Sequence, residues 1–371
     1  MYISLIAFGV IGLLYFFTIA LFAFGFLLKK KHSTNNTDSI PISIVVAVRN
    51  EDRAIDLLFK SIFEQDYPLQ CFELVLVNDH STDATWDIAV KQAQHYSNIL
   101  LAQLPSDLAG KKQAIALGVS LAKNDTIVLT DADCWHSKSW LRTISLAYKN
   151  QKVDMLIGPV MISAGKSVFS RLQALEHASL TASSIGACAL GIPFMASSAN
   201  LSFGKSKLGF NVQMLNPSQA SGDDVFLLHS AKRKKAVKIS YLKGEGGMVF
   251  TQPVKNIKAF FYQRARWASK STGYTDFTAI TVGFIVLLFN LMLVLAMLLS
   301  FWDVIYLKLL VLGFVVKSVA DILLLFSYLK RYHKLSLLNV FVLLQLGYPI
   351  YIVVAFGMAI FTNSTWKGRR G

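Results

Sequence analysis

The sequence is poor in cysteine and in charge. Its three cysteines, Cys71, Cys134 and Cys188, lie far apart and form no CxxC pair, which excludes a disulfide framework and a cysteine zinc site. Charged residues make up 16% of the chain, against about 25% in soluble domains, and the mean hydropathy is +0.47. These values exclude a disordered or collagen-like chain and do not fit an ordinary soluble protein.

Acidic residues are scarce. The chain has 22 Asp and Glu against 37 Lys and Arg, which gives a net charge of +15. Such a balance suits nucleic acid, an anionic membrane surface or a phosphate-bearing substrate. No nucleic-acid-binding motif accompanies it, so we expect no nucleic-acid partner. The charged residues are still too many for a chain that lies wholly in lipid, and we expect a soluble domain joined to membrane helices.

Four long apolar runs cover residues 1–28, 279–302, 304–329 and 335–361. Each is long enough for a spanning helix, which needs about 20 apolar residues. The first is followed by Lys29, Lys30 and Lys31, whereas a cleaved signal peptide carries its positive charge before the apolar run. We therefore expect an uncleaved anchor at 1–28 and three transmembrane helices within 279–361. The positive-inside rule predicts a multi-pass protein of the cell (inner) membrane with its soluble domain in the cytosol. Three C-terminal spans would leave the basic tail outside, against the same rule, so either the tail is too short to matter or one of these runs does not fully span.

The third apolar run contains two opposite charges, Lys317 and Asp321. Intramembrane charges suggest a function, here a transport pathway, for which three C-terminal helices offer little room. The simpler interpretation is a pair that neutralises itself, because a spacing of four residues puts both side chains on one face of a helix.

The rest of the chain divides by composition. Residues 29–40 are interpreted as a polar linker, 41–254 as one soluble domain, 255–278 as an amphipathic interfacial segment and 362–371 as a basic tail. Buried strands are expected at 42–48, 72–77, 99–104, 126–130 and 154–158, with a helix at 111–122. Strands that alternate with helices predict an α/β fold with a parallel, doubly wound sheet.

Polar clusters follow three of these strands, namely Arg49-Asn50-Glu51, Asn78-Asp79 and Asp131-Ala132-Asp133. Sheets of this class bind ligands at the carboxyl ends of their strands, so we expect these side chains on one rim. Residues 50–52 are expected to cap the helix after the first strand. Ser81 or Thr82 is expected to cap the helix after the second.

Asp131 and Asp133 are candidate ligands for Mg²⁺ or Mn²⁺, which prefer oxygen ligands. Such a metal would neutralise a diphosphate leaving group. An isolated DxD is more often a turn or a helix cap, but this one follows a buried strand on the rim of Asp79. Asp79 itself suits hydrogen bonds from a nucleobase or ribose, or a capping role.

Two further segments contain candidate binding or catalytic residues. Lys112, in Gly110-Lys111-Lys112, is a candidate for the diphosphate, although this segment lacks the P-loop spacing and also suits a solvated helix start. Asp223 and Asp224 precede an expected helix at 225–229. They either stabilise its N-terminus or supply a general base for an acceptor hydroxyl.

The sequence Gln263-Arg264-Ala265-Arg266-Trp267 lies in the basic, aromatic stretch before the second apolar run. The stretch as a whole fits an interfacial helix. Gln263, Arg266 and Trp267 remain candidates for an acceptor or diphosphate site, since Arg suits phosphate and Trp suits the apolar face of a sugar.

Four of these motifs occur along the chain in the order Asp79, Asp131-Ala132-Asp133, Gly222-Asp223-Asp224 and Gln263–Trp267. In this order they resemble the motifs of the membrane-bound family 2 glycosyltransferases, a group that includes cellulose, chitin and hyaluronan synthases and ceramide glucosyltransferases. The resemblance covers about residues 41–270 and the flanking helices. It implies a GT-A fold, that is a Rossmann-like, mostly parallel sheet, in the cytosolic domain. It also implies a nucleotide-sugar donor, UDP-linked in our interpretation, and a divalent metal.

The resemblance assigns roles by position. The donor pocket would include Arg49, Glu51, Asp79 and Asp131, and the metal ligands would be Asp131 and Asp133. Asp224 would be the catalytic base. Gln263, Arg266 and Trp267 would line the acceptor and diphosphate end.

Two departures from the family pattern matter. The usual Glu before the base is Asp223 here, so the base could instead be Asp223. Only three C-terminal apolar runs are present, which argues against a long conduction channel and favours the addition of one or a few sugars to a lipid acceptor. We therefore expect an inverting glycosyltransferase that moves a hexose-type sugar to a lipid or lipid-linked glycan in the bilayer. The alternatives are a processive polysaccharide synthase of the same fold and a non-catalytic receptor or scaffold.

Residues 198–200 are interpreted as a strand near the acceptor side. An asparagine in a strand more often has a structural role, and we favour that role for Asn200 over contact with an acceptor.

Overall fold

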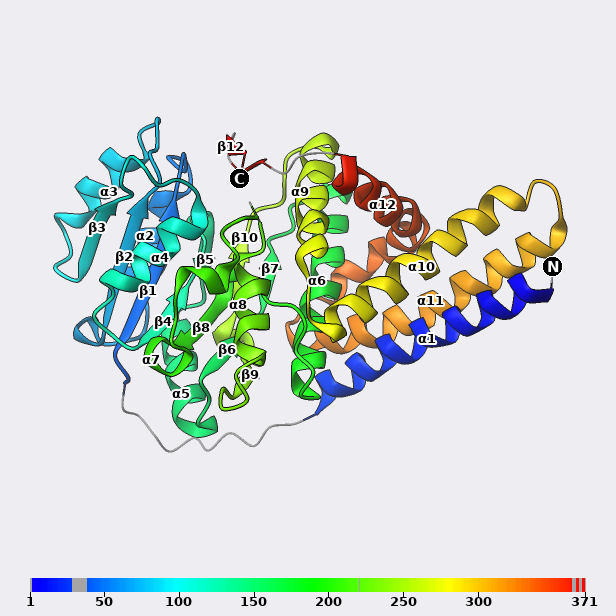
Figure 1. Cartoon of the computed structure of the whole chain (residues 1–371), viewed down its shortest axis with the longest axis horizontal. Coiled ribbons are helices and arrows are strands. Elements are labelled where there is room, and N and C mark those ends of the chain that lie inside the picture. The colour runs from blue at the N-terminus through cyan, green and yellow to red at the C-terminus, as the bar shows by residue number, and fades with distance from the viewer. Residues whose placement is uncertain (1, 29–38, 220, 362–364, 367–368, 371) are drawn as a thin grey trace. The chain divides into compact units, whose positions relative to one another are not determined.

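The computed structural model describes residues 2–28, 39–219, 221–361, 365–366 and 369–370, and Figure 1 shows its elements. The chain divides into two compact units. Unit 1 comprises Met1–Leu28, Ala164–Phe194 and Pro253–Asn363, and unit 2 comprises Lys29–Ser163, Met195–Gln252 and Ser364–Gly371. Residues 164–194 thus group with unit 1, although they fall within the range expected for the soluble domain. Residues 29–38 of the expected linker, and most of the tail at 362–371, lie outside the described residues.

Unit 2 is built on a seven-stranded sheet with the strand order β3-β2-β1-β4-β8-β6-β9. Its strands are β1 (Ile42–Val48), β2 (Phe72–Asn78), β3 (Ile99–Gln103), β4 (Thr126–Leu129), β6 (Met155–Ile157), β8 (Leu201–Gly204) and β9 (Ile239–Tyr241). β1 pairs in parallel with β2 and β4, and β2 with β3, while β8 runs antiparallel to β4 and β6. All five strands expected from apolar runs are present, and the mostly parallel sheet is confirmed.

Helices cover both faces of this sheet. Ile44 and Val46 of β1 share one apolar core with α2 (Ile55–Phe63) and α5 (Trp140–Gln151). Val45, on the opposite face because side chains alternate along a strand, meets α4 (Lys111–Leu121). A Cβ on Gly118 of α4 would lie 2.5 Å from the Val45 side chain, so glycine lets this helix approach the sheet closely.

The remaining elements of unit 2 are short. A three-stranded sheet has the order β5-β10-β7, formed by β5 (Cys134–His136), β10 (Val249–Thr251) and β7 (Val160–Ile162). The other elements are α3 (Thr85–Ala93), α7 (Lys205–Leu208), α8 (Asp223–Lys232), four 3-10 turns η1 (Leu69–Cys71), η2 (Ser198–Asn200), η3 (Val212–Leu215) and η4 (Glu245–Gly247), and the two-residue strands β11 (Thr365–Trp366) and β12 (Arg369–Arg370).

The helix caps expected after β1 and β2 are wrong. The N-cap residues of α2 and α3 are Ala54 and Ala84. Both loops are cross-linked instead: the Ser81 hydroxyl accepts from the Asn50 amide at 3.1 Å, and the Asn50 side chain accepts from the Thr82 amide at 2.8 Å. The Ser81 hydroxyl and the Asn50 side chain, two of the expected capping groups, are therefore engaged between the loops. Each helix begins a few residues later than expected.

Residues 198–200 form the 3-10 turn η2 rather than a strand, and β8 begins only at Leu201. Asn200 is buried. Its side chain accepts from the Trp140 indole at 3.0 Å and donates to the carbonyls of Pro159 and Gly247, each at 2.8 Å. These bonds join separate segments of unit 2 and give Asn200 a structural role.

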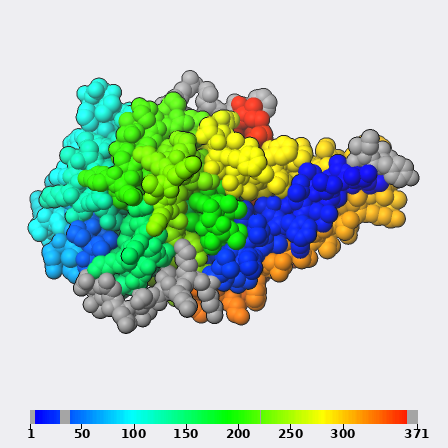
Figure 2. All heavy atoms as spheres, turned by 60° about the horizontal axis from the view of Figure 1, so that its bottom comes forward, coloured from blue at the N-terminus to red at the C-terminus, as the bar shows by residue number. Residues whose placement is uncertain are grey.

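Unit 1 is helical. Its helices are α1 (Tyr2–Leu27), α6 (Val168–Ala189), α9 (Ile257–Ser269), α10 (Phe277–Leu299), α11 (Val304–Arg331) and α12 (Phe341–Phe361), with the 3-10 turns η5 (Lys270–Gly273) and η6 (Leu335–Val340). Four segments are long and apolar enough to cross a membrane, Leu5–Leu27, Phe277–Leu299, Val304–Arg331 and Leu335–Ile360, which agrees with the four expected runs. Figure 2 shows α1, in blue, along the orange atoms of α11.

The helices of unit 1 pack closely where small residues allow it. A Cβ on Gly25 of α1 would lie 2.3 Å from the Gly186 carbonyl of α6, and one on Gly186 would lie 2.2 Å from the Phe22 carbonyl. Two glycines therefore let these backbones touch, as small residues do at helix interfaces in membranes.

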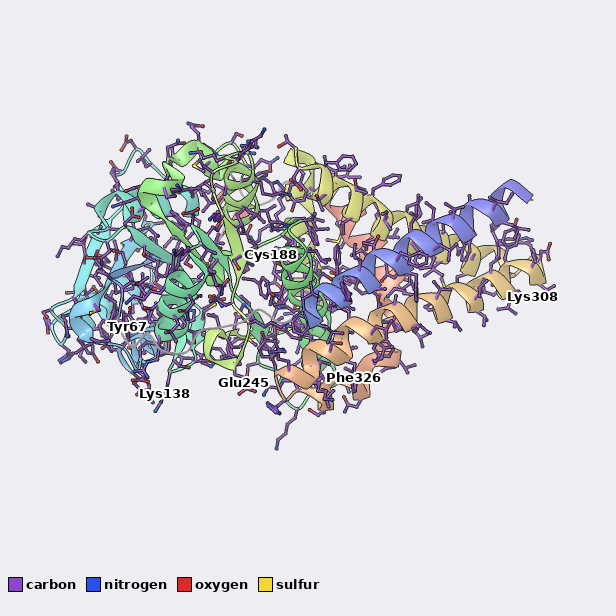
Figure 3. The ribbon with its side chains drawn as sticks, turned by 90° about the horizontal axis from the view of Figure 1, so that it is seen from below. Tyr67, Lys138, Cys188, Glu245, Lys308 and Phe326 are labelled. Atoms are coloured by element: carbon purple, nitrogen blue, oxygen red, sulfur yellow. The ribbon has the colours of Figure 1, made fainter. Side chains whose placement is uncertain are left out.

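A buried polar cluster joins three of the apolar helices. Lys317 and Asp321 of α11 form the expected pair at 2.6 Å. The Asp321 carboxylate also accepts from the Tyr15 hydroxyl of α1 at 2.6 Å and from the Gln345 amide of α12 at 2.9 Å. Lys317 is fully buried, whereas Lys308 is exposed near the start of α11, far along the helix from Phe326 (Figure 3). The pair thus connects helices as well as neutralising itself.

We expect Lys317→Met to destabilise the folded protein by about 3–5 kcal/mol, because it leaves a buried carboxylate without its cation. The double variant Lys317→Met/Asp321→Leu should recover most of that loss, since no buried charge remains. Thermal unfolding in detergent measures both, with Lys308→Met as the exposed control on the same helix. Equal melting temperatures for Lys317→Met and the wild type would contradict the assignment.

Candidate active site

Acidic side chains meet at one rim of the unit 2 sheet. Asp131 and Asp133 follow β4, and their carboxylate oxygens lie with the Cys134 sulfur within 4.8 Å of one another. Asp133 is exposed and Asp131 is partly exposed. Two accessible carboxylates at this spacing fit a hard divalent cation such as Mg²⁺ or Mn²⁺, whereas the buried thiol is a softer ligand. The chemistry of these carboxylates is therefore compatible with the expected metal site.

Lys111, at the start of α4, lies among these acids. Its ammonium group is 2.8 Å from Asp131 and 3.2 Å from Asp223, and it donates to the Ser198 hydroxyl at 2.7 Å. Both ion pairs are largely shielded from solvent. One lysine thus connects the loop after β4 with the first turn of α8.

Neighbouring charges shift the pKa values of Lys111 and Asp223. Burial alone would raise the pKa of Asp223, but Lys111, the Ser198 hydroxyl and Lys112 lower it to about 2. Burial alone would lower the pKa of Lys111, but Asp131 and Asp223 raise it above its usual value. Both partners are therefore charged at neutral pH. A carboxylate with so low a pKa is a weak proton acceptor.

Lys112, the lysine expected at the diphosphate, contacts the backbone of the segment before α8. It is buried, and its ammonium group donates to the carbonyls of Asn216 and Ser221 at 2.8 and 2.9 Å. It also lies over the Phe226 ring, 5.0 Å from the centroid. These contacts tie α4 to the segment before α8 and to α8 itself, while Lys111 forms the ion pairs with the rim acids.

The donor-side residues lie around the ends of β1 and β2. Asp79 is fully buried, and its carboxylate accepts from the Gly110 amide at 3.1 Å. Arg49 donates to the backbone carbonyls of Asp79 and His80 at 2.6 and 3.1 Å. The Glu51 amide donates to the Thr85 hydroxyl at 2.7 Å. Arg49 and Asp79 therefore shape the loops of the rim, and Asp79 connects it to the start of α4.

Asp223 and Asp224 begin α8 after its N-cap residue Gly222. Asp223 is buried and paired with Lys111, whereas Asp224 is partly exposed and accepts from the Val225 amide at 2.7 Å. The helix N-terminus favours negative charge at both positions. Of the two, Asp224 is the more accessible to an incoming hydroxyl.

His136 supports the loop that carries Asp131 and Asp133. Its two ring nitrogens lie 2.9 Å from the hydroxyls of Ser61 and Thr130, and the ring stacks on Trp140 with centroids 4.0 Å apart. Burial lowers the pKa of His136 to about 3. The imidazole is therefore neutral in the folded protein and holds Thr130, the residue before Asp131.

Because burial lowers the pKa of His136, we expect the folded protein to lose stability in acid. Because the unfolded histidine takes up a proton below about pH 6.5 and the folded one does not until about pH 3, stability falls as pH drops through that window. The loss is about 2 kcal/mol between pH 6.5 and 5 for this group alone. We expect His136→Gln to flatten the dependence of the melting temperature on pH over this range. An unchanged slope would show that another group is responsible.

The third set of predicted residues lies in unit 1. Gln263, Arg266 and Trp267 are on α9, whose N-cap Asn256 accepts from the Ala259 amide at 2.9 Å. All three side chains are partly exposed. The structure thus gathers Asp79, Asp131, Asp133, Asp223 and Asp224 within one unit, and presents Gln263, Arg266 and Trp267 together on a helix of the other.

Sequence reasoning did not select three residues of these sites. Cys134 directly follows the DxD, so its place beside the carboxylates could have been read from the sequence. Lys111 was visible only as one of two adjacent lysines. Arg264 lies inside the Gln263–Trp267 motif but is buried against α6, a partner 88 residues away that no local pattern indicates.

The fold and the rim define an α/β domain suited to binding an anionic ligand with a divalent metal, joined to apolar helices. Residues 43–203 match the family described as glycosyl transferase family 2, and residues 126–361 match the glycosyl transferase family group 2. The second match covers more than half of the chain. The protein belongs to the family 2 glycosyltransferases.

Individual relatives agree with this assignment. The chain is 27% identical over 128 residues to a poly(ribitol-phosphate) beta-glucosyltransferase of Bacillus spizizenii, covering 34% of this chain and 20% of that protein. It is 29% identical over 117 residues to a beta-monoglucosyldiacylglycerol synthase of Nostoc sp., covering 31% and 25%. The chain thus spans a quarter or less of these relatives.

The architecture also has a solved counterpart. The mannosyltransferase PcManGT from Pyrobaculum calidifontis, whose structure contains GDP-Man and Mn²⁺, aligns with a TM-score of 0.56 over 97% of both chains at 15% identity. This likeness shows the GT-A fold alone.

Proposed function

We propose that this protein is an inverting, membrane-anchored glycosyltransferase that moves a hexose-type sugar from a UDP-linked donor to a lipid or lipid-linked glycan. The observation that carries the proposal is the rim of unit 2, where Asp131 and Asp133 lie beside Lys111, and Lys111 contacts Asp223 at the start of α8. This rim combines a cation site, a fixed positive charge and an accessible carboxylate, Asp224, in the domain that carries the family fold.

In the proposed reaction the acceptor hydroxyl oxygen bonds to the anomeric carbon of the donor as the bond from that carbon to the diphosphate oxygen breaks. The electron pair of the broken bond leaves with the nucleoside diphosphate. Asp224 takes the proton of the hydroxyl, because Asp223 is held as a weakly basic carboxylate by Lys111. Attack opposite the leaving group inverts the anomeric centre.

Asp131 and Asp133 would hold Mg²⁺ or Mn²⁺, which supplies charge neutralisation of the leaving diphosphate. Arg49 and Asp79 order the loops of the donor side, and Glu51 is proposed to line the same pocket. Gln263, Arg266 and Trp267 are proposed to serve the acceptor and the diphosphate. Arg suits phosphate by its planar set of donors, and Trp suits the apolar face of a sugar.

The membrane context supports a lipid acceptor. Four helices are long and apolar enough to cross a membrane, a bilayer concentrates a lipid substrate, and the name of the Nostoc relative denotes a glycolipid product. Basic residues after α1 and at the end of α11, Lys29–Lys31 and Lys330–Lys334, favour a cytosolic catalytic domain at the inner membrane.

One assay tests the proposal. Membranes that contain the protein are incubated with Mn²⁺ or Mg²⁺ and a panel of radiolabelled UDP- and GDP-sugars, and lipid products are separated from polymer. We expect metal-dependent label in the lipid fraction from a UDP-sugar. Label in long polymer would instead identify a processive synthase. Tight nucleotide binding without any transfer would identify a binding protein and overturn the proposal.

A further inference from the structure

A buried arginine lies inside the Gln263–Trp267 motif. The Arg264 side chain is 2% exposed, whereas its neighbours Gln263 and Trp267 are partly exposed. Its guanidinium donates to the Gln263 side-chain oxygen at 2.5 Å and lies over the Trp267 ring, 4.1 Å from the centroid. Arg264 therefore contacts two of the three residues proposed for the acceptor side.

Arg264 is itself held from two other helices. Its Nε and Nη2 atoms donate to the two carboxylate oxygens of Glu176 on α6 at 3.2 and 2.5 Å. The same carboxylate accepts from the Tyr351 hydroxyl of α12 at 2.9 Å. Burial alone would lower the pKa of Arg264, but Glu176 and Tyr351 raise it. The guanidinium is therefore fixed in position and charge.

The face of α6 that carries Glu176 makes two more contacts with the same segment. The Gln173 side chain donates to the Val254 carbonyl at 3.0 Å and accepts from the Val254 amide at 2.9 Å. The His177 ring meets the edge of Trp267 at 5.9 Å between centroids. Residues at i, i+3 and i+4 share one helix face, so one face of α6 holds the approach to α9, Arg264 and Trp267.

We propose that Arg264, locked by Glu176, is a positioning residue that orients the side chains of Gln263 and Trp267 for sugar transfer. The proposal rests on the proposed function. A lysine cannot reproduce it, because only the planar guanidinium places donors on three separate nitrogens, two facing Glu176 and one facing Gln263, while its plane lies over the Trp267 ring. A buried ion pair is often no more stable than an apolar pair of similar size, so stability alone does not account for its place within the motif.

The test compares four variants of the full chain in membranes. Arg264→Lys keeps the charge opposite Glu176 but loses the planar guanidinium, whose separate nitrogens bind Glu176 and Gln263. Arg264→Met/Glu176→Met removes the pair without leaving a buried charge. Gln263→Ala and Arg264→Lys/Gln263→Ala close a double-mutant cycle. Lys258→Met, which removes an exposed charge from the same helix, is the matched control.

We expect Arg264→Lys and the double Met variant to lower kcat about 10²-fold, the cost of misplacing a group by about 1 Å. The donor KM should stay within about twofold, since the acids of unit 2 are unaltered, and Lys258→Met should behave as wild type. The loss in Arg264→Lys/Gln263→Ala should be smaller than the product of the two single losses, because part of the effect of Arg264 passes through Gln263, while the part that passes through Trp267 remains.

Wild-type kcat in either Arg264 variant, or fully additive effects with Gln263→Ala, would overturn the inference. If the double Met variant does not fold, Arg264→Lys and the cycle decide alone. If the wild-type protein transfers sugar and the Arg264 variants are fully active, only this inference is refuted. If the wild-type protein transfers no sugar, the proposed function is refuted, and this inference with it.

Discussion

Asp224→Asn is expected to lower kcat for sugar transfer by about 10²–10⁴-fold, the usual contribution of a positioned general base. The amide cannot take the proton of the acceptor hydroxyl. Asp223 cannot substitute for it, because its ion pair with Lys111 lowers its pKa to about 2. The donor KM should stay within about twofold, since Asp131 and Asp133 are intact. Initial rates against donor concentration, at saturating acceptor, separate the two parameters.

Two controls accompany this prediction. Asp87→Asn removes an exposed carboxylate from α3 and should leave kcat unchanged. Asp223→Asn keeps the shape but weakens the hold on Lys111, and it should lower kcat less than Asp224→Asn does. A larger loss in Asp223→Asn would reverse the assignment of the base.

Asp133→Ala should reduce turnover by about 10³-fold, because it removes one of the two carboxylates proposed to hold the metal, and loss of metal assistance costs several kcal/mol. Binding of UDP should also lose its dependence on Mn²⁺, while the affinity measured without metal stays within about twofold. Isothermal titration of UDP with and without Mn²⁺ provides this readout independently of catalysis.

Asp133→Glu is the matched variant. It keeps a carboxylate on a longer side chain, so we expect it to recover part of the Mn²⁺ dependence. Unchanged Mn²⁺-dependent UDP binding in Asp133→Ala would place the metal elsewhere, whatever happens to turnover.

Much of the catalytic unit was predictable because its signals are local. Residues 42–48 form a continuous β-branched run, and β1 spans the same residues. The residues after β1, β2 and β4 then had to share a rim, because parallel strands end on the same side. Spanning helices are equally local, since about 20 apolar residues suffice to predict one.

The features that the sequence did not predict have a common physical origin. Ser81 and Thr82 suit helix caps, but they bond to Asn50 in another loop. Lys111 and Lys112 are adjacent on one helix and therefore point about 100° apart. Which of them faces the acids depends on how α4 is rotated against the sheet, and the sequence of α4 does not report that rotation.

By itself, the sequence determined the order of strands and helices, the four apolar runs and the order of the motifs, because each depends on neighbouring residues. Tertiary structure alone decided that Lys111 contacts Asp131 and Asp223, that Asn200 is structural, and that α6 groups with the apolar helices and pairs Glu176 with Arg264. Those partners are separated by 20 to more than 100 residues. Only the packing of complete helices and strands brings them within hydrogen-bond distance.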